Sequence, residues 1–128
     1  MARFYTKNIT VEDSFLDEMK HVNNVVFLKL LQDVAIDHWY AEADQAQRDS
    51  IRWIARKHEI EYLKPAFLND LLKIDTWIES FNAVSTLRKY EIYKRDQLIV
   101  QASTLWVALD ANSLKPMRLS QDILAKFQ

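Results

Sequence analysis

The sequence predicts an α+β fold in which one long helix packs on a single curled antiparallel sheet. One stretch with helical periodicity begins near residue 24, and no second long helix follows it. Four strand-like runs lie between residues 51 and 110, and a fifth precedes the helix. With 128 residues, 49% of them hydrophobic, the chain has the size of one domain with its own core. We therefore expect a single domain over residues 1–128.

The first expected elements are a strand and the long helix. Residues 3–11 contain four β-branched residues and predict a strand, which leads into a polar loop over residues 12–19. From Phe27 to Ala41, apolar residues recur at three- and four-residue steps without Pro or Gly. Asn23 and Asn24 stand directly before this pattern, and Asn is a favoured N-cap residue. We expect a helix of about six turns, roughly 30 Å long, whose wide apolar arc the sheet wraps.

The strands of the sheet are expected in four consecutive runs, at residues 51–63, 71–81, 85–95 and 97–110. In the run 71–81, apolar residues alternate with Lys73, Asp75 and Glu79, which is typical of an antiparallel strand with one wet face. The run 97–110 is apolar on both faces and predicts an interior or covered strand. Ser120 can cap a short helix through Phe127.

The turns between these strands must form without glycine, because the chain contains none. Asn and Asp tolerate the left-handed backbone region better than other residues with side chains. We therefore expect the turns at Asn69 and Asp70, Asn82, Asp96 and Asn112.

Composition excludes several classes of function. The formal net charge is -1, from 17 basic and 18 acidic residues mixed along the chain, so we expect no nucleic-acid partner. The chain has no cysteine, and His38 and His58 have no partner at a metal-ligand spacing, so we expect no metal and no cofactor. The longest apolar run, residues 105–109, is too short to span a bilayer, and we expect a cytoplasmic protein with no membrane partner.

The expected sheet also implies self-association. One helix cannot cover both faces of a five-stranded sheet, and sheet edges need protection. Four Trp, five Tyr and six Phe are many for this length, and aromatic residues are enriched at interfaces. We expect a homodimer or a homotetramer.

The densest run of reactive side chains is DEMKHVNN, residues 17–24, between the first strand and the helix. A helix that starts at Asn24 directs its free amides and the positive end of its dipole toward the loop that carries Asp17. A carboxylate beside a helix start can activate water and stabilise developing negative charge. Simple capping by Asn23 and Asn24 explains the same local features equally well.

These residues also carry a resemblance that extends over nearly the whole chain. Asp17, His21 to Asn24 and Phe27 fall on a loop pattern that reads Asp, two variable residues, Gly, His-Val-Asn-Asn and a following aromatic residue. The segments IEYLKPAFLNDLLKIDTWI and TLWVALDANSLKPMRL match further strands and turns of the same pattern. In these segments the chain resembles hotdog-fold acyl-CoA thioesterases of the 4-hydroxybenzoyl-CoA thioesterase-like group. Lys20 stands where that family has glycine.

The resemblance implies roles for the loop residues. Asp17 falls on the catalytic carboxylate, as base or nucleophile, and the amide near Asn24 falls on the donor that polarises the thioester carbonyl. His21 is either catalytic or, by our preference, an anchor that holds the loop. Asn23 and Phe27 are expected to contact the substrate.

The resemblance also implies a site for coenzyme A, which would be part of the substrate rather than a cofactor. The start of the fourth strand commonly contacts coenzyme A in this family, which assigns Ser85, Thr86, Arg88 and Lys89 to that contact. Arg and Lys suit phosphate chemically. Weaker candidates for the same contact are Arg52, Arg56 and Lys57.

Three functions remain open from the sequence. The first is hydrolysis of an acyl or aroyl thioester by Asp17 and the helix start. The second is a hotdog hydratase or dehydratase, in which His21 would be indispensable. The third is a non-catalytic protein that binds acyl-CoA. The sequence leaves open the acyl group and the choice between coenzyme A and an acyl carrier protein.

Overall fold

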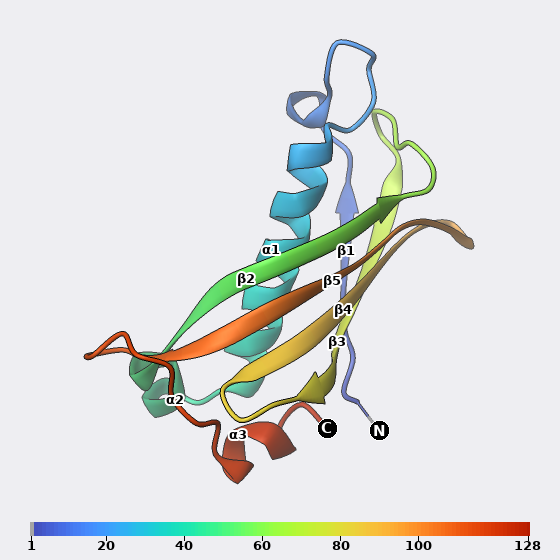
Figure 1. Ribbon diagram of the computed structural model, residues 1–128. Coiled ribbons are helices and arrows are strands. Elements are labelled where there is room, and N and C mark those ends of the chain that lie inside the picture. The colour runs from blue at the N-terminus through green and yellow to red at the C-terminus, as the bar shows by residue number, and fades with distance from the viewer. Residues whose placement is uncertain (1) are drawn as a thin grey trace.

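The computed structural model describes residues 2–128 and has the expected α+β architecture (Figure 1). The strands are β1 (Tyr5–Thr10), β2 (Ile51–Tyr62), β3 (Leu71–Phe81), β4 (Ser85–Lys94) and β5 (Gln97–Asp110). They form one five-stranded sheet in the order β1-β3-β4-β5-β2, in which all neighbours are antiparallel. The long helix is α1 (Asn24–Glu42). Strand β5 lies inside the sheet, which confirms the expectation for the run that is apolar on both faces.

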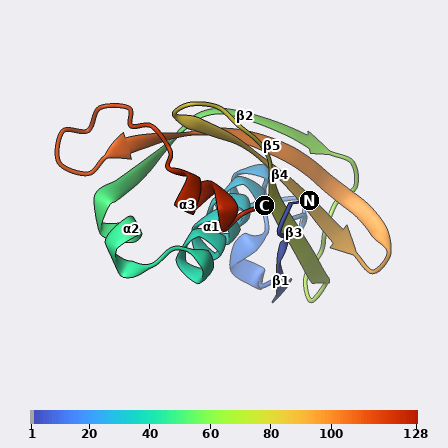
Figure 2. The same cartoon turned by 90° about the horizontal axis from the view of Figure 1, so that it is seen from below.

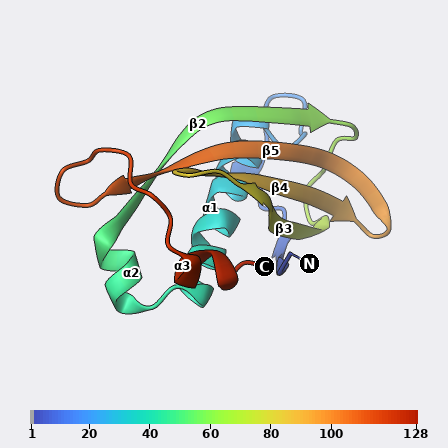
Figure 3. The same cartoon turned by 60° about the horizontal axis from the view of Figure 1, so that its bottom comes forward.

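Helix α1 lies in the concave side of the sheet, which curls around it (Figures 2 and 3). Leu31 and Val34 of the helix are at most 1% exposed and belong to the same core cluster as Leu72 and Ile74 of β3. The alternation predicted for residues 71–81 therefore points its apolar face at the helix. Burial of these side chains supplies the main force that holds helix and sheet together.

The chain also contains short helices, of which the sequence indicated only one. Helix α3 (Gln121–Ala125) is capped by Ser120, as predicted, with the Ile123 N–H donating to Ser120 Oγ over 3.3 Å. The 3-10 turn η1 (Asp13–Phe15) and helix α2 (Gln45–Ser50) were not predicted. Helix α2 is polar and six residues long, so it shows no apolar period, although Asp44 and Gln47 form a capping box at its start.

The glycine-free turns use the left-handed region at four residues, Lys20, Asn69, Arg95 and Leu114. The prediction for Asn69, with a φ of 70°, is confirmed. At the β4–β5 turn and after β5, Asp96 and Asn112 lie in the turns as predicted, but the positive φ falls on Arg95 and Leu114 instead. Hydrogen bonding accounts for the second case, because Asp110 Oδ1 accepts the N–H groups of Asn112 and Ser113 and thereby fixes the turn.

The sheet leaves one long edge open within the described chain. Strand β2 pairs only with β5, and its other edge of twelve residues has no neighbouring strand. Several large apolar side chains of β2 and α1 are exposed: Val25, Ile36, Tyr40 and Ile54. Among the described residues, no helix is long and apolar enough to cross a membrane.

The contribution of the helix–sheet core can be tested at Leu31, which is 1% exposed. We expect Leu31→Ala to lower the free energy of unfolding by about 2–5 kcal/mol, because it removes buried methyl groups and leaves a cavity. Urea denaturation measures this change. Val25→Ala is the matched control on the same helix, since Val25 is 72% exposed and its truncation should change stability by less than about 0.5 kcal/mol. Equal effects of the two changes would contradict the packing described.

Candidate active site

The loop between β1 and α1 folds into a tight turn at Asp17. The Asp17 N–H donates to the His21 carbonyl oxygen over 2.8 Å, and the Lys20 N–H donates to the Asp17 carbonyl oxygen over 3.0 Å. Lys20 closes this turn with a φ of 64°, in the left-handed region. Glycine suits this position because it has no Cβ to clash there. Lys20 thus keeps the backbone shape that the family's glycine would give, at a cost of about 1–2 kcal/mol.

The Asp17 carboxylate is held by the backbone of its own loop. Its Oδ1 accepts the N–H of Met19 over 2.9 Å and the N–H of His21 over 3.2 Å. Within residues 2–128, its Oδ2 accepts no hydrogen bond. The half-buried side chain thus has one oxygen that fixes its orientation and one oxygen that is free to react.

His21 fixes the loop through its backbone and through the packing of its ring. Its ring meets the Phe67 ring edge-on, with 5.0 Å between the centroids. The next residue, Val22, is buried, and its N–H donates to the Ala66 carbonyl oxygen over 2.9 Å. In the described chain, the ring nitrogens of His21 form no hydrogen bond with Asp17. This geometry favours the anchor interpretation, and a direct catalytic role of His21 remains a prediction.

The start of α1 offers a free amide beside this loop. Asn23 is the N-cap, and its Oδ1 accepts the Val25 N–H over 2.9 Å. Its carbonyl oxygen accepts the N–H groups of Val26 and Phe27. The Asn24 N–H has no hydrogen-bond partner within residues 2–128. The predicted helix start at Asn24 is confirmed, and its first amide is an open donor at the positive end of the helix.

An open cleft of about 330 Å³ brings these groups together. The five residues expected at the catalytic loop and the helix start line it: Asp17, His21, Asn23, Asn24 and Phe27. The opposite wall, residues 62–65, was not assigned to the site from the sequence. Tyr62 at the end of β2 donates its hydroxyl to the Asn24 carbonyl oxygen over 3.3 Å. In the sequence, the Lys-Pro pair after Tyr62 indicated a turn at this place. It did not indicate that this turn would lie against the start of α1.

The residues expected to bind coenzyme A do not form one exposed site. Ser85, Thr86 and Arg88 are at most 8% exposed, and none of them lines the Asp17 cleft. Arg88 lies on the inner face of β4, where its Nη1 donates to His38 Nδ1 over 2.9 Å and to Thr76 Oγ1 over 3.0 Å. The resemblance assigned Arg88 to coenzyme A contact, but alternation along β4 turns this side chain toward the helix, where it is buried.

Lys89 has the opposite orientation on β4 and lies on the outer face of the sheet. Its Nζ is 3.8 Å from Glu79 Oε2, and further glutamates line the same outer groove: Glu59, Glu61 and Glu91. This acidic surrounding opposes phosphate binding. Among the weaker candidates, Arg52 donates to the carbonyl oxygens of Arg48, Asp49 and Ile51, and Lys57 pairs with Glu59 over 2.9 Å. Coenzyme A contact by Lys89 remains a prediction.

Metal binding has no candidate site in the part of the chain that the structure describes. No three His, Asp or Glu side chains there are grouped to hold an ion. The chemistry described for the cleft needs a carboxylate and an amide donor only.

Comparisons with known proteins agree with this fold. The sequence profile of the acyl-ACP thioesterase N-terminal domain family matches residues 3–127. The acyl-CoA thioester hydrolase YbgC of Escherichia coli O6:H1 is 28% identical over 109 residues, which cover 84% of this chain and 81% of that protein. The long-chain acyl-CoA thioesterase FadM of Escherichia coli (strain K12) is 25% identical over 130 residues, which cover 94% of each chain.

Among solved structures, YbaW, a probable thioesterase from Escherichia coli, has a TM-score of 0.83 at 26% identity and covers 94% of both chains. The fold and the comparisons together define a hotdog-fold thioester hydrolase, as the sequence resemblance predicted. The chain belongs to the acyl-ACP thioesterase N-terminal domain family.

The left-handed conformation of Lys20 yields a stability test of the catalytic turn. Lys20→Gly should change the free energy of unfolding by less than about 1 kcal/mol, because relief at positive φ is offset by a more flexible unfolded chain. Lys20→Val should lower it by about 1–3 kcal/mol, because a β-branched residue is poorly tolerated in this region. Urea denaturation measures both. A Lys20→Val variant as stable as the unmodified protein would contradict the turn geometry.

Proposed function

We propose that this protein hydrolyses acyl-CoA thioesters to the free acid and coenzyme A. The main support for this proposal is that Asp17 and Asn24 line the same cleft. One carboxylate oxygen of Asp17 and the backbone N–H of Asn24 have no hydrogen-bond partner there among the described residues. YbgC and FadM, which the chain resembles over most of its length, bear names of acyl-CoA hydrolases and support coenzyme A as the carrier.

In the proposed reaction, the thioester carbonyl oxygen accepts the Asn24 N–H. Asp17 Oδ2 removes a proton from water while the water oxygen attacks the carbonyl carbon. The negative charge moves onto the carbonyl oxygen, where the helix N-terminus stabilises it. When the carbonyl re-forms, the C–S bond breaks and the proton held by Asp17 passes to the thiolate. Acid and thiol leave, and Asp17 is again ionised.

A nucleophilic route uses the same two groups. Asp17 Oδ2 attacks the carbonyl carbon, the thiolate leaves, and a mixed anhydride forms that water then hydrolyses. The two amide bonds to Oδ1 serve either route, because they hold the carboxylate in one orientation. The choice between base and nucleophile stays open in this proposal.

The position of the carrier follows from the charges at the cleft. Lys64 lines the cleft wall, whereas Arg88 is enclosed and Lys89 lies among glutamates on the outer face. Of these three basic residues, Lys64 is therefore the one beside the entering coenzyme A, whose charged phosphates lie a pantetheine arm away from the reacting bond.

Asp17→Asn tests the catalytic proposal directly. The change keeps the size of the side chain and an oxygen for the Met19 and His21 amides, but it removes the basic and nucleophilic carboxylate. We expect kcat for acyl-CoA hydrolysis to fall by about two to four orders of magnitude at unchanged fold, with binding retained. Steady-state kinetics and circular dichroism measure the two properties.

His21→Ala is the matched comparison. A loop anchor would lose activity partly and lose stability as well, because the Phe67 contact disappears. Full loss of turnover in a stable His21→Ala protein, with Asp17→Asn still active, would instead select the hydratase class. An unmodified protein that binds acyl-CoA without turnover would select the non-catalytic binder.

We further propose a homodimer that forms through the open edge of β2. The edge carries unpaired backbone groups over twelve residues, and Ile54 beside it is 52% exposed. Such an edge is a template for pairing with a second copy. The exposed apolar residues of α1, among them Ile36 and Tyr40, add surface that a partner would cover.

Sedimentation velocity at low micromolar concentration tests the dimer. We expect a dimer for the unmodified protein, and for Ile54→Lys a shift toward monomer, because the added charge would be buried at the interface. Leu71→Lys is the matched control, since Leu71 is 62% exposed on β3, away from β2 in the strand order. A stable, folded monomer of the unmodified protein would refute the proposal.

A further inference from the structure

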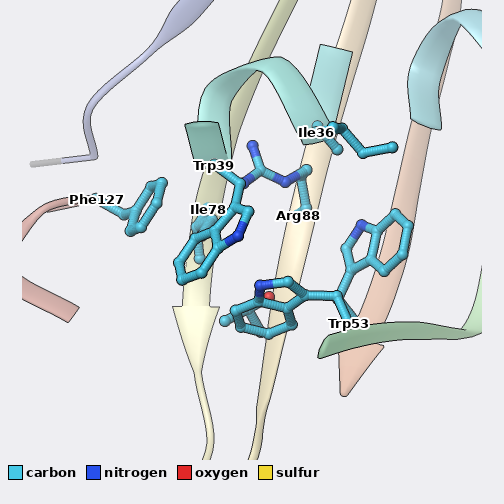
Figure 4. A pocket seen from close by; sticks show the side chains of 9 residues that line it. Ile36, Trp39, Trp53, Ile78, Arg88 and Phe127 are labelled. Carbon is cyan, nitrogen blue, oxygen red and sulfur yellow. The ribbon is translucent and has the colours of Figure 1, made fainter. Parts of the chain in front are cut away.

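A second cavity lies beside the C-terminal half of α1, between the helix and the sheet. Its volume is about 50 Å³, and apolar side chains form most of its wall, including Ile36 and Trp39 of the helix and Trp53 and Trp106 of the sheet. Phe127 closes one side. Figure 4 shows the side chain of Arg88 reaching into this apolar surrounding between Trp39 and Ile36.

Arg88 is an unusual residue for such a place. It is 4% exposed, and no carboxylate within the described chain forms an ion pair with it. Its two hydrogen bonds, to His38 Nδ1 and Thr76 Oγ1, both use Nη1. Arginine has five N–H donors, and most buried charges in proteins are paired. Burial lowers the pKa of Arg88 to about 10, so it keeps its positive charge at neutral pH.

His38 cannot supply the missing negative charge. Burial and the nearby Arg88 lower the pKa of His38 to about 3, so the imidazole is neutral. Its Nδ1 accepts the Arg88 N–H, which places its own proton on Nε2. Arg88 therefore keeps a positive charge in the core, and its hydrogen-bond partners there, His38 and Thr76, are both neutral.

A second donor at the same cavity also lacks a partner. Trp53 Nε1 is buried and has no hydrogen-bond acceptor within residues 2–128. By contrast, the Trp106 Nε1–H donates to the Tyr90 hydroxyl over 3.0 Å. The cavity wall is mostly apolar, and Arg88 brings to it a positive charge that has no negatively charged acceptor among the described residues.

We propose that this cavity binds a carboxylate at the far end of the acyl group, so that the preferred substrates are thioesters of long-chain dicarboxylic acids. This inference rests on the proposed function. A carboxylate pairs with guanidinium through two parallel hydrogen bonds and has two oxygens to accept them. A cavity of about 50 Å³ has room for a group of this size and little more.

The position of the cavity agrees with a long acyl chain. Ile36 is twelve residues beyond Asn24 on α1, which corresponds to roughly 18 Å along the helix axis at its usual rise per residue. A thioester carbonyl at the Asn24 amide and a carboxylate at Arg88 would therefore lie at two ends of an extended chain. Between the two sites the inner face of α1 is apolar and packs against the sheet, so an acyl chain that joins them would take the place of some of these core contacts.

The test compares two nonhydrolysable ligands that differ only at the far end. They are thioether analogues of palmitoyl-CoA and of the mono-CoA thioester of hexadecanedioic acid, and isothermal titration calorimetry measures their binding. We expect the unmodified protein to bind the carboxylate-ended analogue about 10- to 100-fold more tightly, the usual range for a hydrogen-bonded charge in a buried site. Equal binding, or preference for the methyl end, would overturn the inference.

Variants assign this preference to the cavity. Arg88→Met should reverse the preference, whereas Arg118→Met, at an exposed arginine that lines neither cavity, should leave it unchanged. A purely structural Arg88 would change the affinity for both analogues equally. If Arg88→Met does not fold, Trp53→Phe removes the unused N–H together with one ring of the indole; the lost N–H should reduce the preference several-fold, whereas the lost ring surface should change the affinity for both analogues alike. An unchanged ratio in Trp53→Phe would then count against the site.

The two proposals fail in different ways. Equal binding of both analogues by a protein that hydrolyses acyl-CoA overturns the carboxylate site and leaves the thioesterase proposal intact. A clear preference in a protein that hydrolyses neither thioester overturns the catalytic proposal and leaves the binding site intact. Absence of binding by both analogues overturns both.

Discussion

Burial of one helix in the concave side of one sheet is the constraint on which the other features depend. Leu31 and Val34 fix the position of α1 against β3, and the position of its first turn follows from theirs. The open amide of Asn24 is therefore held relative to the wall at Tyr62 by the core as well as by local contacts. Placement of the site by the protein core gives it a precision that a loop alone would not have.

The sequence allowed prediction of features that depend on local patterns. The periodicity of α1, the alternation along β3 and the cap at Ser120 are contained within short stretches, and the structure has all three. The contact between Tyr62 and Asn24 joins the end of β2 to the start of α1, which are 38 residues apart in the sequence. No local sequence pattern predicts such a contact. The burial of Arg88 was missed for a related reason: its assignment to coenzyme A contact took no account of its position in phase with the buried Tyr90 and Ile92.

The chain has no glycine, yet several of its turns use the positive φ that glycine usually supplies. At Lys20, Arg95 and Leu114, hydrogen bonds and turn length impose positive φ on residues that disfavour it. Side-chain preference predicted Asn69 correctly because there the residue type and the turn agree. Asp96 and Asn112 also lie in turns, but there a neighbouring residue takes the positive φ, so composition locates these turns without identifying the residue in the left-handed region.

The Asp17 turn is closed mainly by main-chain groups, and this has a consequence for mutational tolerance. Glu18, Met19 and Lys20 contribute N–H groups or backbone shape to the turn, while their side chains are exposed. Their side chains can be exchanged without displacing the carboxylate, provided that position 20 still accepts positive φ. Random libraries at these three positions would thus vary the surface beside the cleft independently of its chemistry, which makes this turn a suitable starting point for laboratory evolution of carrier preference.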